Sequence, residues 1–233
     1  EGSPIPWLLD FLVRRIGVPF FLIASSAPLL QRWFGTSRHA RAGDPYVLYA
    51  VSNAGSLLGL LTYPTLAEPL LTLGQQQRLW SMGYGVLAAL VEACGAISLL
   101  TGARHPAASA PGERVALTWT QRLRWVLLAA IPSSLLLGVT THLTTDIAAV
   151  PLLWVVPLSL YLLTFILAFG SAQRALPAWL GMAQPIVIVP LAVAMVSGAL
   201  RPAWLIIGLH LAALFLTALL AHRLLAADRP PVS

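Results

Sequence analysis

The sequence predicts an all-α protein, a polytopic transmembrane helical bundle of about seven helices. Of its 233 residues 58% are hydrophobic and only 9% are charged, and the mean hydropathy is +0.81. A water-soluble domain usually carries about 25% charged residues. Several stretches without any charged side chain also reach the roughly 20 residues that a helix needs to cross the hydrocarbon layer. We therefore expect the lipid bilayer to be the main partner of this chain.

Apolar stretches separated by glycine, proline and charged residues predict the individual helices of a single membrane domain over residues 1–233. The clearest stretches, which contain no Asp, Glu, Lys or Arg, are 46–67, 147–173, 175–200 and 202–222. The expected helices cover residues 16–34, 46–66, 79–101, 125–145, 147–170, 176–198 and 202–221. The longest connection, Gly102 to Gln121, carries prolines and several charges, which predicts a solvated loop.

The first expected helix contains prolines, and the second carries small residues on one face. The helix over 16–34 is apolar and contains Pro19 and Pro28, which tend to kink a helix. The helix over 46–66 carries small residues on one face, and its Gly55 and Gly59 predict close contact with a neighbouring helix. Asn53 lies in the same segment, where it can pack, hydrogen-bond across the bundle or contact a substrate.

Glu92 lies inside the third expected helix, where a charged side chain costs on the order of 3 kcal/mol or more unless it is paired or hydrated. We therefore expect it to face the interior of the bundle. Small residues, Gly85 and Gly95 among them, share its face and favour close approach of another helix. Two interpretations stay open: a proton or cation site in a cavity, or a carboxyl group that fixes helix packing.

The fourth expected helix ends in an unusually polar run, Thr140 to Asp146. If the helix continues that far, His142 and Asp146 share a face at positions i and i+4 and can form a titratable pair. Asp146 can instead cap the start of the fifth helix, which is the interpretation that we favour here. Two such side chains without a third ligand give no coordination sphere, so we predict no metal site.

The last three expected helices are the most apolar. Prolines, including Pro157, Pro185 and Pro190, predict kinks within them. Gln184 and His210 are isolated polar residues in these helices, and we interpret both as hydrogen-bonded interior groups.

The distribution of arginine between the connections predicts the orientation of the bundle. Arg14, Arg15, Arg78 and Arg201 fall on one side and the other ten arginines on the opposite side. Because cytoplasmic loops are enriched in basic residues, we expect Glu1 outside and Ser233 inside the inner membrane of a bacterium. The start lacks a signal peptide, so we expect further helices upstream of it.

Several classes of function are excluded by what the sequence lacks. Although the net charge is +6, the basic residues form no run with interleaved aromatics, so we expect no nucleic-acid partner. The chain contains no glycine-rich nucleotide turn, paired cysteine motif or Gly-x-Ser-x-Gly. We therefore expect no cofactor and no catalytic residue in this chain.

Four segments carry a family resemblance: IGVPFFLIASSAPLLQRWF (16–34), DPYVLYAVSNAGSLLGLLTYPTLAEP (44–69), QQRLWSMGY (76–84) and THLTTDIAAVPLLWVVPLSLYLLTFILAF (141–169). They resemble the membrane half of bacterial spermidine-synthase-like integral membrane proteins, which join a major-facilitator-like region to a spermidine synthase domain. The resemblance covers most of the chain and weakens after about Gly170. It implies upstream helices and a downstream cytoplasmic synthase-like domain, neither of which lies in these 233 residues.

The resemblance implies a membrane-embedded module that anchors or regulates a cytoplasmic aminopropyltransferase-like domain. The carboxylates and nucleotide-binding turn of a synthase have no counterpart here, so no catalytic residue is carried over. The alternative is a transport module for a cationic small molecule such as a polyamine, whose amines would suit Glu92 and Asp146, with His142 and Asn53 as further candidate binding residues. The connection after the first helix, Gly35 to Arg41, departs from the major-facilitator loop pattern because it lacks an Asp-Arg core.

Overall fold

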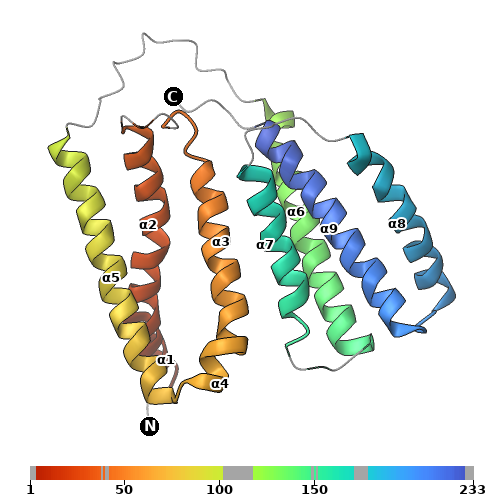
Figure 1. Cartoon of the computed structure of the whole chain (residues 1–233), viewed down its shortest axis with the longest axis horizontal. Helices are drawn as coiled ribbons and strands as arrows, with labels where there is room; N and C mark the ends of the chain where they lie inside the picture. The colour runs from red at the N-terminus through yellow and green to blue at the C-terminus, as the bar shows by residue number, and fades with distance from the viewer. Residues whose placement is uncertain are drawn as a thin grey trace. The chain divides into compact units, whose positions relative to one another are not determined.

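A computed structural model describes residues 4–37, 39, 42–101, 118–147, 150, 152–170 and 178–228. All regular elements within these ranges are helical, as predicted (Figure 1). In chain order they are α1 (Pro4–Leu12), α2 (Val18–Gly35), α3 (Val47–Thr62), α4 (Glu68–Leu70), α5 (Leu73–Leu100), α6 (Trp119–His142), α7 (Val155–Phe169), α8 (Ala178–Ser197) and α9 (Ala203–Ala227).

Three π-helical turns make some of these elements continuous. Val13–Gly17 joins α1 to α2, Tyr63–Ala67 joins α3 to α4, and Leu143–Ile147 extends α6. A proline stands in the first turn of α2, and Pro64 lies in the second π-helical turn. Because proline cannot donate the hydrogen bond of a regular helix, the wider π turn accommodates it without ending the helix. The described residues thus form seven continuous helical segments, which confirms the predicted number.

Four of the described helices are long and apolar enough to cross a membrane: Leu73–Leu100, Trp119–Ile147, Ala178–Ser197 and Ala203–Ala227. The helix Val155–Phe169 is apolar but shorter. The sequence predicted more spans of full length, including the uncharged stretches 46–67 and 147–173. Among the described residues of the second stretch, α7 covers 15 residues and begins after a turn at residues 152–154.

Several predicted boundaries are wrong by more than a turn. Helical structure begins at Pro4 rather than residue 16, and α5 begins at Leu73 rather than residue 79. The fourth helix begins at Trp119 because Thr118 and Gln121 form a capping box, in which each side chain binds the other residue's backbone N–H. Residues 119–121, predicted to end the loop 102–121, therefore belong to the helix. Residues 102–117 lie outside the described residues.

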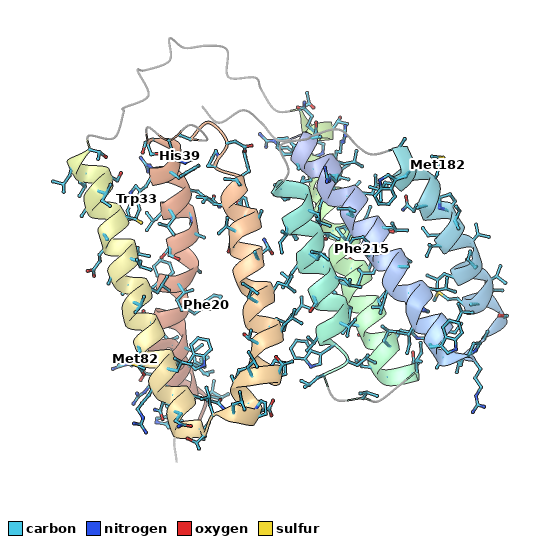
Figure 2. The ribbon with its side chains drawn as sticks, viewed as in Figure 1. Phe20, Trp33, His39, Met82, Met182 and Phe215 are labelled. Atoms are coloured by element: carbon cyan, nitrogen blue, oxygen red, sulfur yellow. The ribbon has the colours of Figure 1, made fainter. Side chains whose placement is uncertain are left out.

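The helices fall into two compact units, of which the first contains α1, α2 and α5. In this unit α2 and α5 are parallel, and both run from the bottom to the top of the view in Figure 1. Trp33 of α2 lies beside α5 (Figure 2), and a Cβ on Gly95 would lie 3.1 Å from its ring. Gly95 therefore lets α2 and α5 approach closely, as expected for a small residue on this face, whereas a Cβ on Gly85 would meet nothing within 4 Å.

The second unit contains α3, α4 and α6 to α9, and α9 is its centre. This helix packs against α6, α7 and α8, and it holds half of the buried residues of the described chain. Leu214 of α9 meets Val139 and Leu143 of the α6 segment in one apolar cluster, and Leu216 and Leu219 meet Leu180 of α8 in another. Phe215 of α9 packs at the edge of the second cluster (Figure 2).

The end of α9 is fixed by a polar contact with the start of α6. The indole N–H of Trp125 donates to Oδ2 of Asp228 at 3.0 Å, and Nε of Arg124 lies 3.5 Å from the same oxygen. This contact explains why the last helix extends to Ala227 rather than to the predicted residue 221. The carboxylate satisfies the indole donor, and the arginine balances its charge.

The contact predicted at Gly55 and Gly59 is not made within the described residues, because a Cβ on either glycine would have nothing within 4 Å. α3 instead packs on α7 through its buried Ala50, which would lie 3.4 Å from a Cβ on Gly170. Tyr49 of α3 adds a ring contact with Phe169, with 6.0 Å between ring centroids. The covered face of α3 is therefore the one that carries the small residue Ala50, and not the one expected from Gly55 and Gly59.

Candidate functional site

His142 and Asp146 form the hydrogen bond that their spacing allows. The helical structure of α6 continues to Ile147, so the two side chains lie on one face, and Nδ1 of His142 is 2.7 Å from Oδ2 of Asp146. Because an ionised carboxylate only accepts, Nδ1 carries the proton and donates it to this bond. The capping role favoured for Asp146 is wrong, since α7 starts at Val155 with Trp154 in the capping position.

His210 of α9 lies against His142. The two ring centroids are 4.8 Å apart with an angle of 39° between the planes. His210 is only 4% exposed, and its Nδ1 donates to the carbonyl oxygen of Ile206 at 2.8 Å. Its Nε2 is buried without a hydrogen-bond partner, so the prediction of a fully hydrogen-bonded interior group is wrong for this atom.

A cavity of ≈ 100 Å³ adjoins the two imidazoles. It is bounded by the end of α8 and by the turn that leads into α9, and its remaining lining is apolar apart from backbone atoms. The lining residues are His142, Ala194, Met195, Gly198, Ala199, Leu200, Ile206 and His210. The two histidines therefore form the polar side of a small pocket in an apolar wall.

A second buried imidazole lies further along α9. His222 is 1% exposed, and its Nδ1 is 2.9 Å from Oγ1 of Thr164 on α7. The Thr164 hydroxyl donates to the carbonyl of Tyr161 at 2.6 Å, so His222 must be the donor in the first bond. Phe165 covers the imidazole at a centroid distance of 3.9 Å. Nε2 of His222, like that of His210, is buried without a partner.

The same network reaches α6 through Tyr161. Ser133 donates to the carbonyl of Ala129 at 2.9 Å, and its Oγ lies 3.0 Å from the Tyr161 hydroxyl, which therefore donates to it. Sequence analysis missed this group entirely. The available signal was the presence of Ser133, Tyr161, Thr164 and His222 in otherwise apolar helices, since buried polar side chains in a membrane bundle need partners.

Glu92 lies in the first unit, on an open groove between α2 and α5 with a volume of ≈ 270 Å³. The groove is otherwise lined mainly by apolar side chains, together with Ser25, Ser26 and Tyr84. Both serine hydroxyls donate to backbone carbonyls of their own helix, at 3.1 Å and 2.6 Å. The Glu92 side chain is exposed on this groove, and none of the described residues forms an ion pair with it.

The remaining predicted site residue, Asn53, binds its own helix. Its Nδ2 donates to the carbonyl of Tyr49 at 2.8 Å, which is a bond within α3. Of the four predicted site residues, Glu92, Asp146, His142 and Asn53, the structure brings His142 and Asp146 into hydrogen-bond contact. Gln184 does bond between helices, donating to Oγ1 of Thr217 on α9 at 3.4 Å.

Among the described residues, no three His, Cys, Asp or Glu side chains cluster in a way that could hold a metal ion. Cys94 of α5 is free and exposed. Comparison of the chain with protein-family models, curated proteins and solved structures gives no match.

We predict that Thr164→Val weakens the second unit. Valine keeps the shape of threonine but removes the acceptor, which leaves the His222 donor buried and unsatisfied. The free energy of unfolding should fall by about 1–3 kcal/mol. Unfolding in detergent, followed by circular dichroism, measures the change. Thr144→Val is the matched control, because the Thr144 hydroxyl bonds only to its own helix; equal stability of the two variants would contradict the role given to Thr164.

Proposed function

We propose that this chain is the membrane-embedded module of a spermidine-synthase-like protein, and that it anchors or regulates a cytoplasmic aminopropyltransferase-like domain outside these residues. The observation that carries the proposal is the set of long apolar helices with exposed apolar side chains, which suit lipid rather than water. α5 makes the point most clearly, since none of its 28 residues is buried. A module of this kind needs no catalytic residues of its own.

The resemblance of four long segments to the membrane half of these proteins supports the identity of the partner domain. The arginine distribution supports its location, because ten of fourteen arginines fall on the side that carries Ser233. A cytoplasmic carboxyl terminus is the arrangement that a following cytoplasmic domain requires.

The orientation can be tested by cysteine labelling in intact bacteria, on a Cys94→Ala background that removes the native exposed thiol. Ser109→Cys, in the segment 102–117, should resist a membrane-impermeant maleimide until the cells are permeabilised. Thr72→Cys, in the connection before α5, should react in intact cells. Labelling of Ser109→Cys from outside would overturn the proposed orientation and with it the placement of the partner domain.

A second function, binding and transport of a cationic solute, is favoured by the groove at Glu92. The serine hydroxyl protons are engaged by backbone carbonyls, so the groove offers a solute the acceptor oxygens of Ser25, Ser26 and Glu92. A primary ammonium group has three donors and no acceptor, which suits such a set. Tyr84 adds an aromatic face that can attract the same charge. A carboxylate in an apolar helix that has no ion-pair partner among the described residues is by default a candidate functional site.

For this second function we predict that Glu92→Gln keeps the fold and lowers the affinity for spermidine at least tenfold. Glutamine preserves shape and hydrogen bonding but removes the charge that attracts the amine. Binding to protein in nanodiscs is measured by calorimetry, with thermal unfolding recorded in parallel. Glu68→Gln is the matched control, an exposed carboxylate on α4. Equal spermidine binding by two equally folded proteins would exclude the transport function and leave the anchoring function as the proposal.

A further inference from the structure

The pair His142 and His210 has the arrangement of two imidazoles prepared to bind one metal ion. Each ring is held through Nδ1, His142 by the Asp146 carboxylate at 2.7 Å and His210 by the Ile206 carbonyl at 2.8 Å. A metal-binding histidine almost always donates its second ring N–H to a carboxylate or a backbone carbonyl, because this fixes the tautomer and the direction of the free nitrogen. Both Nε2 atoms are left with their lone pairs.

Nε2 of His210 needs an explanation of its own. It has no hydrogen-bond partner and belongs to a side chain that is only 4% exposed, in a residue that lines the ≈ 100 Å³ cavity. A buried polar atom without a partner is rare in folded proteins, and an ion is one of the groups that satisfy such atoms. The cavity is large enough for an ion or a water molecule.

The distance between the rings is compatible with a shared ion. With a metal to imidazole nitrogen distance of about 2 Å, and a ring centre about 1 Å beyond that nitrogen, two ligating rings can lie up to about 6 Å apart. The observed centroid separation is 4.8 Å, and the rings are tilted rather than stacked flat. The two histidines come from α6 and α9, which pack against each other in the same unit.

A third donor lies in the same cavity wall. Met195 of α8 lines the cavity with both histidines, and its thioether is a soft and flexible ligand. Among the described residues no third His, Cys, Asp or Glu joins the pair, and the third donor is instead the sulfur of a methionine. Thioether ligands select copper(I), and imidazole binds copper as well.

We propose that His142, His210 and Met195 form a binding site for a soft monovalent metal ion of the copper(I) class. All three donors are neutral and Asp146 is the one carboxylate bonded to them, so a divalent ion would leave one positive charge uncompensated in an apolar wall, which is costly. A monovalent ion brings one, and the Asp146 carboxylate bonded to His142 balances it. Asp146 is thus a positioning and charge-balancing residue rather than a ligand.

The proposal is tested with silver(I), a redox-inert probe of the same class, titrated into the full chain in nanodiscs. Every protein carries Cys94→Ala, since an exposed thiol would bind silver by itself. We expect one high-affinity equivalent and a higher unfolding temperature with the ion bound. X-ray absorption of the copper(I) form should show two nitrogen donors and one sulfur donor.

Variants of exposed residues keep the test independent of folding. Asp146→Asn should lower the affinity about 10–100-fold, the range seen when the partner of a ligating histidine is lost. Met195→Leu should weaken silver(I) binding more than zinc(II) binding, and Met182→Leu, an exposed methionine on the same helix (Figure 2), should change neither. His210→Gln, a change at a buried ligand, should abolish the high-affinity binding of one silver(I) ion per chain.

Wild-type silver affinity in both Asp146→Asn and Met195→Leu would overturn the site. Tighter binding of zinc(II) than of silver(I) by the parent protein would overturn the assignment of ion class. The proposed anchoring and transport functions depend on the orientation of the chain and on Glu92, so failure of this test leaves them unaffected.

Discussion

The organisation of this chain depends on one constraint, the absence of water from the hydrocarbon of a bilayer. There, each backbone polar group needs a partner within the protein, which selects helices, and each polar side chain needs one as well. The described residues satisfy the first demand with helices, and π-helical turns carry the chain past prolines. Apolar side chains of α5 and α8 are left exposed, as expected for surfaces that lipid covers.

The second demand explains how polar residues are distributed in the second unit. The side chains of Asn53, Thr144 and Ser133 donate to backbone carbonyls of their own helices, so these donors need no partner on a neighbouring helix. The longer side chains reach across: His222 to Thr164, Gln184 to Thr217, and Trp125 to Asp228. These three bonds end on α9 or on its C-cap Asp228, whereas the bond from Tyr161 to Ser133 joins α7 to α6. The helix that holds half of the described buried residues thus also makes several of the polar contacts between helices.

The sequence predicts the number of helices well because long uncharged stretches separated by glycine, proline and arginine have few alternative interpretations. It predicts their ends poorly. The start of α6 was predictable from the Thr118 and Gln121 capping box, whereas the late start of α7 depends on a turn in which Leu152 takes a positive φ of 65°. Such a conformation in a leucine is set by the surrounding fold, and no local sequence pattern predicts it.

The site was predicted only where its residues are close in sequence. The spacing of His142 and Asp146 was sufficient to suggest their bond. The contact of His142 with His210 and the bond of His222 to Thr164 join residues far apart in the chain, and they depend on how α6 and α7 pack against α9. The small-residue rule was right at Gly95, whereas in the second unit α3 packs on α7 through Ala50 and not through Gly55 or Gly59. Several small residues lie along α3, and the sequence alone did not show which of them meets a neighbour.

The central claim is that lipid covers the exposed apolar faces, and spin labels on α5 test it most directly. Nitroxides at Val86→Cys and Leu90→Cys, two exposed positions, are placed on the Cys94→Ala background in lipid nanodiscs. Collision rates are compared for oxygen, which concentrates in hydrocarbon, and for a water-soluble nickel chelate. The account predicts frequent collisions with oxygen and few with nickel at both positions. More frequent collisions with nickel would contradict it.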